Sequence, residues 1–577
     1  MQRALVLSAS LLFACAVPDD TSSTDQELCG GPATVNVQIL GINDFHGNLE
    51  APEGANGQVT IGFDSLGKPI TVSAGGAGFL ATHIDELRAQ NENTVVVSSG
   101  DLIGASPLVS ALFHDEPTIE VFNAIGLDFN GVGNHEFDEG PAELLRMQNG
   151  GCNPIDGCAD GDGFSGSTFQ FLAADVYRAN NHTLFPPFKV RSFGGAKVAF
   201  IGMTLHDTPS IVSPAGVEGL TFTDEASTAN ALVHYLQTFG VHTFVVLVHQ
   251  GGGQTGVGSG IYDDCVGLTG PIVDIVNNLD PAVKVVLSAH THNAYNCTIN
   301  GRIVTSAASF GRLITKVDLT LDRDTGDVTA ATAHNVIVSR DVAQDPTVKA
   351  IVDRYLGLSA ALANRVVGSI TSDIRRIYKI DGTTRDDGKE SPLGDVIADA
   401  QLASTAAPTR GGSQIAFMNP GGIRADLMYT SSSAGEGDGN VTYKEAFTVQ
   451  PFANVLATIT LTGQQIKAVL EQQFGTNQPP GGRVLQVSSG FSYVYSASAP
   501  IGSKISSMML NGAPIDLSAS YRVTINGFLA DGGDNFTAFK QGTSRLGGDV
   551  DIDALVAYLT AQSPVPPGPA NRITVAP

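Results

Sequence analysis

The chain has 577 residues, which is too many for one hydrophobic core, so we expect two large domains. Its formal net charge is -25, from 57 acidic against 32 basic side chains, and it contains no basic run. A protein that binds nucleic acid through its phosphates needs a basic surface, so the composition argues against nucleic acid or an anionic membrane surface as a partner.

The first 33 residues are predicted to be a signal peptide and linker. The segment MQRALVLSASLLFACAVPDDTSS has one Arg and an apolar run too short to span a bilayer, which is typical of a secretory signal. The run LLFAC ends at Cys15 and is similar to a bacterial lipoprotein cleavage site. Two alternatives stay open, a lipid anchor at Cys15 or cleavage nearby without a lipid. Both predict export to the periplasm, the cell surface or the medium.

The cysteines agree with export. Cys152 with Cys158 and Cys265 with Cys297 are the disulfide pairs expected from proximity, which leaves Cys29 over. A zinc cluster is the alternative, but the short spacings of such sites are missing.

Apolar runs alternate with helical patterns from about residue 35 to residue 340. The runs that predict strands are TVNVQILGINDFHG, NTVVVSSGDLIG, KVAFIGMTL, TFVVLVHQGGG and VKVVLSAHTHN. Their continuous Val and Ile content indicates strands that are buried on both faces of a layered α/β domain. Each run ends in Asp, Asn, His or Gly, and α/β sheets bind ligands beyond the ends of their strands.

Residues 341–577 are predicted to form a connector and a second domain. Residues 341–365 include the helical pattern DPTVKAIVDRYLGLSAALAN, which we interpret as a connecting helix and a hinge between the domains. Residues 366–577 open with a helix predicted in SPLGDVIADAQLAS and continue with short strands and turns.

Polar residues that could hold metal ions follow the predicted strands and the helical run TIEVFNAIGLDF. They are Asp44, His46, Asp101, Asn134, His135, His249, His290 and His292. A single His after a strand is more often a hydrogen-bonded structural residue, but five such motifs in one α/β domain are hard to explain as turns. Imidazole and carboxylate ligands suit two divalent metals, which can hold a hydroxide between them for attack on phosphorus.

The series NDFHG, GDLIG, GNHEFD, VHQGG and AHTH resembles the calcineurin-like metallophosphoesterases, and with the second domain it resembles the periplasmic and extracellular 5′-nucleotidases. The resemblance implies a four-layer α/β/β/α domain at residues 34–340, followed by a mixed α+β substrate domain. It implies two divalent ions, Zn, Mn or similar. Their implied ligands are Asp44, His46 and His292 for the first ion, Asn134, His249 and His290 for the second, and Asp101 as a bridge.

The same resemblance implies a catalytic dyad. His135 would stabilise the transition state or protonate the leaving oxygen, and Asp138 would orient the His135 ring.

The motifs MNPGGIRADL, VQPFANVL and NGFLADGGDNF resemble the substrate-binding domain of that family. The resemblance implies that Asn419 and Arg424 contact substrate, that Phe452 and Phe528 stack on the base, and that Asp534 accepts hydrogen bonds from the ribose. A further Arg is expected before ESPLGD. Arg385 is our candidate, with Arg375, Arg376 and Lys389 as alternatives.

The sequence therefore predicts an exported 5′-nucleotidase that acts on a small nucleotide substrate through a metal-bridging hydroxide. Alternatives on the same scaffold are a 2′,3′-cyclic-nucleotide phosphodiesterase/3′-nucleotidase and a UDP-sugar hydrolase. A lipoprotein that only binds nucleosides is a third alternative, although no expected ligand has been lost. The loop NPIDGCADGDGFSG, with Asp156, Asp160 and Asp162, resembles a calcium loop in composition, but a disulfide-stapled surface loop is the favoured interpretation.

Overall fold

The structure, a computed structural model, describes residues 33–576 except residues 213, 257, 431 and 433. The predicted signal segment, with Cys15 and Cys29, lies outside these residues. Within the described part of the chain, no helix has the length and apolar character needed to cross a bilayer.

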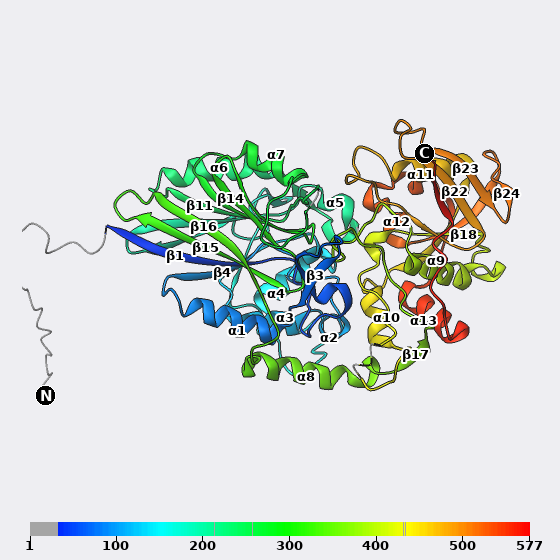
Figure 1. Ribbon diagram of the computed structural model, residues 1–577, viewed down its shortest axis with the longest axis horizontal. Helices are drawn as coiled ribbons and strands as arrows, with labels where there is room; N and C mark the ends of the chain where they lie inside the picture. Colours follow the sequence, from blue (N-terminus) through cyan, green and yellow to red (C-terminus); the bar gives the residue numbers. More distant parts are fainter. Residues whose placement is uncertain (1–32, 213, 257, 431, 433, 577) are drawn as a thin grey trace, which may run out of the picture.

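Two six-stranded sheets form the N-terminal unit (Figure 1). The first sheet has the order β16-β15-β1-β4-β5-β6, with bounds β1 Thr34–Ile42, β4 Thr94–Ser98, β5 Phe129–Gly131, β6 Gln170–Leu172, β15 Leu313–Asp322 and β16 Val328–Ile337. The second has the order β13-β14-β12-β11-β9-β8, with bounds β8 Phe188–Phe193, β9 Ala196–Met203, β11 Thr243–Val248, β12 Val283–Ser288, β13 Ala294–Ile299 and β14 Arg302–Ala307. The strands β1, β4, β5 and β6 run parallel, as do β9, β11, β12 and β14.

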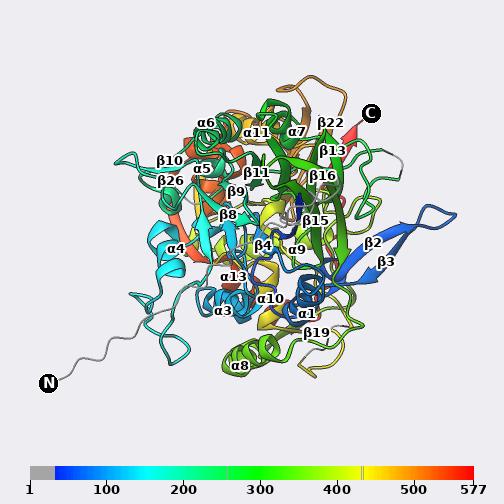
Figure 2. The ribbon, with the colours of Figure 1, turned by 90° about the vertical axis from the view of Figure 1, so that its left-hand side faces the viewer.

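The two sheets pack face to face, with helices on both outer faces. Val37 and Val95 of the first sheet share one buried apolar cluster with Val198 and Val245 of the second. Figure 2 shows the helices on the two outer sides, which are α1 Ala77–Arg88 and α3 Glu116–Ile125 on one and α6 Glu225–Gln237 and α7 Pro271–Asn278 on the other. The predicted four-layer α/β/β/α architecture is confirmed.

The five predicted strands are β1, β4, β9, β11 and β12, and the helical run before GNHEFD is α3. All residues of β11 are buried, as expected for a strand covered on both faces. β1 ends at Ile42, two residues before Asp44, and β11 ends directly before His249. The candidate ligands therefore leave the sheets at the carboxyl ends of parallel strands.

The connector is a helix, α8 Pro346–Ala363. Its N-cap Asp345 accepts a hydrogen bond from the amide of Val348, which satisfies one of the free amides at the helix start. Tyr355 is fully buried in the core that α1 and α3 also share. The domain limits and a hinge at α8 stay predictions.

The acidic loop after α4 (Gly140–Asn149) contacts this connector. Both predicted disulfides, Cys152–Cys158 and Cys265–Cys297, are present. Arg354 Nη2 lies 2.9 Å from Asp160 Oδ2 and 2.8 Å from Asp162 Oδ2. These carboxylates are thus engaged by a guanidinium, which supports the disulfide-stapled loop over a calcium site.

The C-terminal unit is mixed α+β, as predicted. Its five-stranded sheet has the order β21-β18-β25-β20-β26, with bounds β18 Ile415–Met418, β20 Val455–Thr462, β21 Gln486–Val487, β25 Ser520–Asn526 and β26 Thr543–Val550. A four-stranded sheet has the order β24-β23-β22-β27, with bounds β22 Phe491–Ser496, β23 Ile505–Leu510, β24 Ala513–Pro514 and β27 Ile573–Ala576. The main helices are α9 Pro392–Thr405, α10 Tyr443–Val449, α11 Gly463–Gln472, α12 Gly527–Ala530 and α13 Asp551–Gln562.

Local signals explain where the C-terminal helices begin. The predicted helix α9 starts after Ser391, whose hydroxyl accepts from the amide of Gly394. Thr442 with Glu445 forms a capping box at the start of α10.

A hairpin of the N-terminal unit, β2 Gln58–Phe63 with β3 Pro69–Ser73, projects from the body (Figure 2).

Candidate metal centre and substrate site

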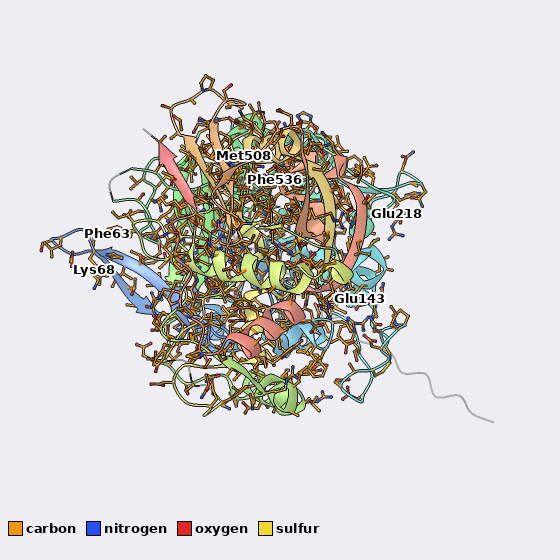
Figure 3. All side chains as sticks on the ribbon, turned by 90° about the vertical axis from the view of Figure 1, so that its right-hand side faces the viewer. Phe63, Lys68, Glu143, Glu218, Met508 and Phe536 are labelled. Carbon is orange, nitrogen blue, oxygen red and sulfur yellow. A yellow bond between two sulfur atoms is a disulfide. The ribbon has the colours of Figure 1, made fainter. Side chains whose placement is uncertain are left out.

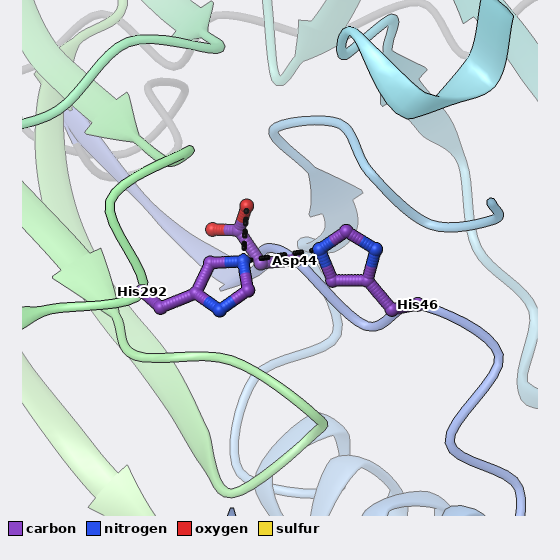
Figure 4. A group of neighbouring side chains, drawn as sticks. All are labelled: Asp44, His46 and His292. Atoms are coloured by element: carbon purple, nitrogen blue, oxygen red, sulfur yellow. Dashed lines mark hydrogen bonds and ion pairs between the residues drawn. The ribbon is translucent and has the colours of Figure 1, made fainter. Parts of the chain in front are cut away.

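Three side chains meet at the position predicted for the first metal. Asp44 and His46 follow β1 and His292 follows β12, and Figure 4 shows them pointing toward one another. His46 Nε2 lies 3.0 Å from His292 Nε2, which lies 3.6 Å from Asp44 Oδ1. Potential ligand atoms of these three residues all lie within 4.8 Å of one another, close enough to share one ion.

Three more side chains form a second group, Asp101, His249 and His290, whose potential ligand atoms also lie within 4.8 Å of one another. The amide Oδ1 of Asn134 joins it, 3.1 Å from His249 Nε2 and 2.9 Å from His290 Nδ1. Asp101 Oδ2 lies 3.0 Å from His249 Nε2 and 3.6 Å from His46 Nε2. Asp101 therefore lies between the two groups, at the place predicted for a bridging carboxylate.

The arrangement of hydrogen-bond acceptors fits bound cations. His249 Nδ1 lies 2.9 Å from the carbonyl oxygen of Ser99, which only accepts, so Nδ1 carries a proton and Nε2 is the ring atom that faces the cluster. This Nε2 faces the oxygens of Asp101 and Asn134, which are acceptors. Burial alone would lower the pKa of His249, but the charge of Asp101 outweighs it and raises the pKa to about 9, so Nε2 carries a proton that a metal ion would replace. A positive charge is needed between them, either a proton or a metal ion, and a set of imidazole, carboxylate and amide ligands suits Zn or Mn.

Burial sets the protonation states of the cluster. It lowers the pKa of His290 to about 3 and the pKa values of His46 and His292 well below the usual range, so these rings are neutral. Burial alone would raise the pKa of Asp101, but the positive charges of His249 and His135 outweigh it and hold that pKa well below its usual range. Neutral imidazoles and an ionised carboxylate are the forms that bind metals.

The backbone at these residues adopts a conformation that side chains rarely tolerate. The φ angles are 49° at Asp44, 48° at His46, 50° at Asp101, 71° at His290 and 56° at His292. Non-glycine residues with positive φ carry strain and concentrate at functional sites. The surrounding hydrogen bonds therefore have to hold them there.

Glu136 supplies part of that support, and the sequence analysis did not single it out. Its carboxylate accepts from the amides of Asp101 at 2.9 Å, Leu102 at 2.9 Å and Gly133 at 2.8 Å. Its place inside GNHEFD was the only available signal. Glu136 fixes the loop that carries Asp101 against the loop that carries Asn134.

The two residues of the predicted dyad are in contact. His135 Nδ1 lies 2.9 Å from Asp138 Oδ2, and the backbone amide of His135 donates to Asp101 Oδ1 at 2.8 Å. The rings of His135 and His46 meet edge to face, with centroids 5.1 Å apart. The imidazole of His135 is thus held directly beside the two side-chain groups, which we call the metal cluster because they could hold two ions.

Two predicted substrate residues of the C-terminal unit reach the same cluster. Arg424 Nη2 lies 3.4 Å from His46 Nε2, and the ring of Phe452 stacks on His135 with centroids 5.7 Å apart. The guanidinium of Arg424 lies 5.7 Å from the centroid of Phe452. Residues from both halves of the chain therefore share one site.

The other predicted contacts form a separate hydrogen-bonded group. Asn419 Nδ2 donates to Asp534 Oδ2 at 2.8 Å, and Arg483 Nη1 lies 3.0 Å from Asp534 Oδ1. Phe528 lies over Gly533, where a Cβ would come within 2.4 Å of the ring. The ring contacts of Phe452 are with His135 and Arg424. The sequence analysis did not single out Arg483.

The geometry favours Arg385 among the candidates before ESPLGD. Its Nη1 donates to the carbonyl oxygen of Ile423 at 3.3 Å, directly before Arg424 in the chain, although its guanidinium also pairs with Asp387. The alternatives are engaged elsewhere. Arg375 and Lys389 are mostly exposed and pair with nearby carboxylates, and Arg376 is buried against Asp426.

Comparisons with known proteins identify the family of both units. Residues 37–294 match the calcineurin-like phosphoesterases, and residues 366–541 match the 5′-nucleotidase C-terminal domain. The chain is 33% identical over 552 residues to the cell wall protein Lmo0130 of Listeria monocytogenes, covering 92% of this chain and 67% of that protein. It is 29% identical over 561 residues to the endonuclease YhcR of Bacillus subtilis, covering 96% of this chain but 42% of YhcR.

A solved structure extends the likeness to three dimensions. The crystal structure of a 5′-nucleotidase precursor from Thermus thermophilus has a TM-score of 0.74 and 26% identity, covering 94% of this chain and 99% of that one. These matches indicate a phosphoric monoester hydrolase, and the family uses two divalent metals. The chain belongs to the family in which a calcineurin-like phosphoesterase domain is followed by a 5′-nucleotidase C-terminal domain.

Proposed function

We propose that the protein is an exported 5′-nucleotidase that hydrolyses nucleoside 5′-monophosphates to nucleoside and phosphate. The observation that carries this proposal is the meeting of the two units at one site. Arg424 of the C-terminal unit lies 3.4 Å from His46, and Phe452 stacks on His135. A phosphate-binding group and an aromatic platform thus lie against a cluster suited to phosphoryl transfer.

The side chains of the C-terminal unit account for nucleotide binding. The planar guanidinium of Arg424 suits two phosphate oxygens, and it stays charged at neutral pH although burial lowers its pKa to about 10. Phe452 and Phe528 offer π-faces to a base of any kind. Asp534, held by Asn419 and Arg483, would accept from the ribose hydroxyls.

The metal-binding residues follow from the two side-chain groups. Asp44, His46 and His292 would hold one divalent ion, and Asn134, His249 and His290 the other, with Asp101 shared. When bound, two such ions supply an activated water and neutralise charge that develops on the phosphoryl group.

His135 would carry the proton for the leaving oxygen. Its Nδ1 donates to the carboxylate of Asp138, which fixes the ring and leaves Nε2 free to face the substrate. A positioned imidazole can protonate the departing nucleoside oxygen from that atom. Asp138 acts through His135 as a positioning residue.

Export is part of the proposal. The disulfides Cys152–Cys158 and Cys265–Cys297 form in oxidising compartments and are rare in the cytosol.

Phosphate release from AMP tests the function. The protein should release phosphate when Mn²⁺ or Zn²⁺ is present, and a chelator should stop the release. His135→Ala should lower kcat roughly 10²–10⁴-fold, the range for loss of a general acid. The matched control is His234→Ala, whose side chain is 68% exposed on α6. Full activity in His135→Ala, or release that is indifferent to the chelator, would contradict the proposal.

A further inference from the structure

Asp115 stands directly before helix α3, at the position where an aspartate usually accepts a hydrogen bond from the free amides of the first helical turn. Its side chain makes no such bond. Its backbone has a φ of 62°, in the left-handed region where glycine is the least strained residue. Neither helix capping nor the backbone conformation therefore explains an aspartate at this position.

The carboxylate of Asp115 is buried and joins α3 to the loop that follows Asp101. Oδ2 accepts from the backbone amide of Gly104 at 2.9 Å, and Oδ1 accepts from the hydroxyl of Ser110 at 2.5 Å. The hydroxyl of Ser110 lies 2.7 Å from the hydroxyl of Thr118, within α3. Both carboxylate oxygens are thus engaged, and one of them holds the backbone of the loop.

Gly104 in turn contacts a candidate metal ligand. Its carbonyl oxygen lies 2.8 Å from Nδ1 of His46. A carbonyl oxygen only accepts, so Nδ1 of His46 carries a proton and Nε2 is the ring atom that faces the metal cluster. In a neutral ring, Nε2 then presents the lone pair that a divalent ion needs. The contact with Gly104 therefore sets both the tautomer and the direction of the His46 ring.

The backbone at Gly104 lies in a confined space. Its φ is 81°, and a Cβ at this residue would lie 2.3 Å from the carbonyl oxygen of His135. A side chain is excluded there, so the position requires glycine. Because glycine has wide conformational freedom, the hydrogen bond from its amide to Asp115 restricts the loop, and with it the carbonyl that contacts His46.

We propose that Asp115 is a positioning residue of the metal centre, which acts on His46 through the backbone of Gly104. The inference rests on the proposed function and deepens it, because it adds to the ligands a residue that fixes one of them. Loss of a group that orients a metal ligand typically lowers metal affinity 10–100-fold. Asp115 acts through an intervening residue, so we expect the lower end, about tenfold, for the ion that Asp44, His46 and His292 would hold.

Calorimetric titration of Mn²⁺ into the metal-stripped full-length protein tests the proposal. Asp115→Gly removes the carboxylate and places at a φ of 62° the residue that tolerates it best. The Kd of one of the two Mn²⁺ ions should rise about tenfold, and the other Kd should not change. Asp115→Asn keeps an oxygen that can accept from Gly104, so its Kd values should stay within about threefold of wild type.

Two control variants separate this role from a general effect on the fold. Asp224 stands at the start of α6, is exposed and caps that helix in the usual way, by accepting from the amide of Ser227 at 2.8 Å. Asp224→Gly is therefore the matched control. Lys68→Ala is the second control, at the projecting tip of the β2–β3 hairpin (Figure 3). Both controls should bind Mn²⁺ with wild-type Kd values.

The Nδ1 proton of His46 gives a second reading that needs no metal ion. Its NMR resonance in metal-stripped protein, assigned by its absence in His46→Asn, should be present in wild type and in Asp115→Asn. It should be lost to exchange with water in Asp115→Gly, because the carbonyl of Gly104 is no longer held against the ring.

Unchanged Kd values in Asp115→Gly, or an equal rise in Asp224→Gly, would overturn the positioning role. A rise in Asp115→Asn as large as that in Asp115→Gly would overturn it as well, and so would a His46 resonance that persists in Asp115→Gly. A wild-type protein that binds Mn²⁺ but does not hydrolyse AMP would count against the proposed function alone. If the wild type bound no Mn²⁺, the proposed metal centre would fail, and the resonance of His46 would still decide the role of Asp115.

Discussion

Replacing Arg376 by Met should destabilise the C-terminal unit and displace Arg424. The guanidinium donates from Nε to Asp426 Oδ1 at 3.0 Å, from Nη1 to the carbonyl oxygen of Arg424 at 2.7 Å and from Nη2 to Asn56 Oδ1 at 2.9 Å. Asn56 belongs to the N-terminal unit and donates to the same carbonyl at 3.2 Å. Methionine keeps the apolar stem but leaves the carboxylate of Asp426, 3% exposed, without its cation.

The size of the effect follows from these contacts. Removing one partner of a buried ion pair costs about 3–5 kcal/mol. The hydroxyl of Tyr378 still donates to Asp426 Oδ2 at 2.6 Å, so we expect the lower end of that range. A loss of about 3 kcal/mol in a unit of this size lowers Tm by roughly 6–12 °C.

Differential scanning calorimetry and AMP kinetics provide the assay. Arg376→Met should lower the Tm of the C-terminal transition, and kcat/KM for AMP should fall because Arg424 loses its support. The double variant Arg376→Met with Asp426→Leu is the control, because removal of both partners leaves no unpaired charge and should recover most of the Tm. A Tm within about 2 °C of wild type in the single variant, or a double variant no more stable than the single one, would refute the reasoning.

Three other predictions concern the pH dependence and the site. A hydrogen bond to Glu139 raises the pKa of His114 to about 9, above its unfolded value, so the contribution of His114 to stability is complete below about pH 6.5 and is lost as pH rises through 9. Urea unfolding of His114→Gln should therefore show a loss of about 1–2 kcal/mol in the free energy of unfolding at pH 6 and a much smaller loss at pH 10. Equal losses at the two pH values would contradict this. Asp138→Asn should lower kcat for AMP roughly 10²-fold with little change in KM, because Asp138 orients His135 without touching substrate; a change confined to KM would argue against that role. Phe452→Ala should raise KM for AMP roughly 10–100-fold, from the ~1–3 kcal/mol of base stacking, and leave KM for ribose 5-phosphate unchanged; equal effects on both would exclude stacking.

The sequence predicted the layered N-terminal unit and its cluster because the information is local. The apolar runs mark strands buried on both faces, and the polar residues that follow them must emerge at the same edge of the sheets. Asp44 and His292, far apart in the chain, meet for that reason. The capping residue Ser391 likewise marks the start of α9 in the sequence itself.

Contacts between units could not be predicted in this way. Asn56 and Arg376 lie in different halves of the chain, and no periodicity or turn signal links them. The ion pair between Asp160 and Arg354 could not be predicted either, because the two residues lie far apart in the sequence. Without that contact, the composition of the loop resembles a calcium loop. Charge alone did not distinguish Arg385 from its neighbours, because only the fold shows that its guanidinium lies beside the backbone that carries Arg424.

The most direct test of the central claim is a metal titration. Metal-stripped protein should show no phosphate release from AMP until Mn²⁺ or Zn²⁺ is added, and full activity should require two equivalents of the ion. Asp101→Asn, which weakens the shared ligand between the two side-chain groups, should prevent that recovery. Full activity with one equivalent, or in the presence of a chelator, would contradict a two-metal phosphohydrolase.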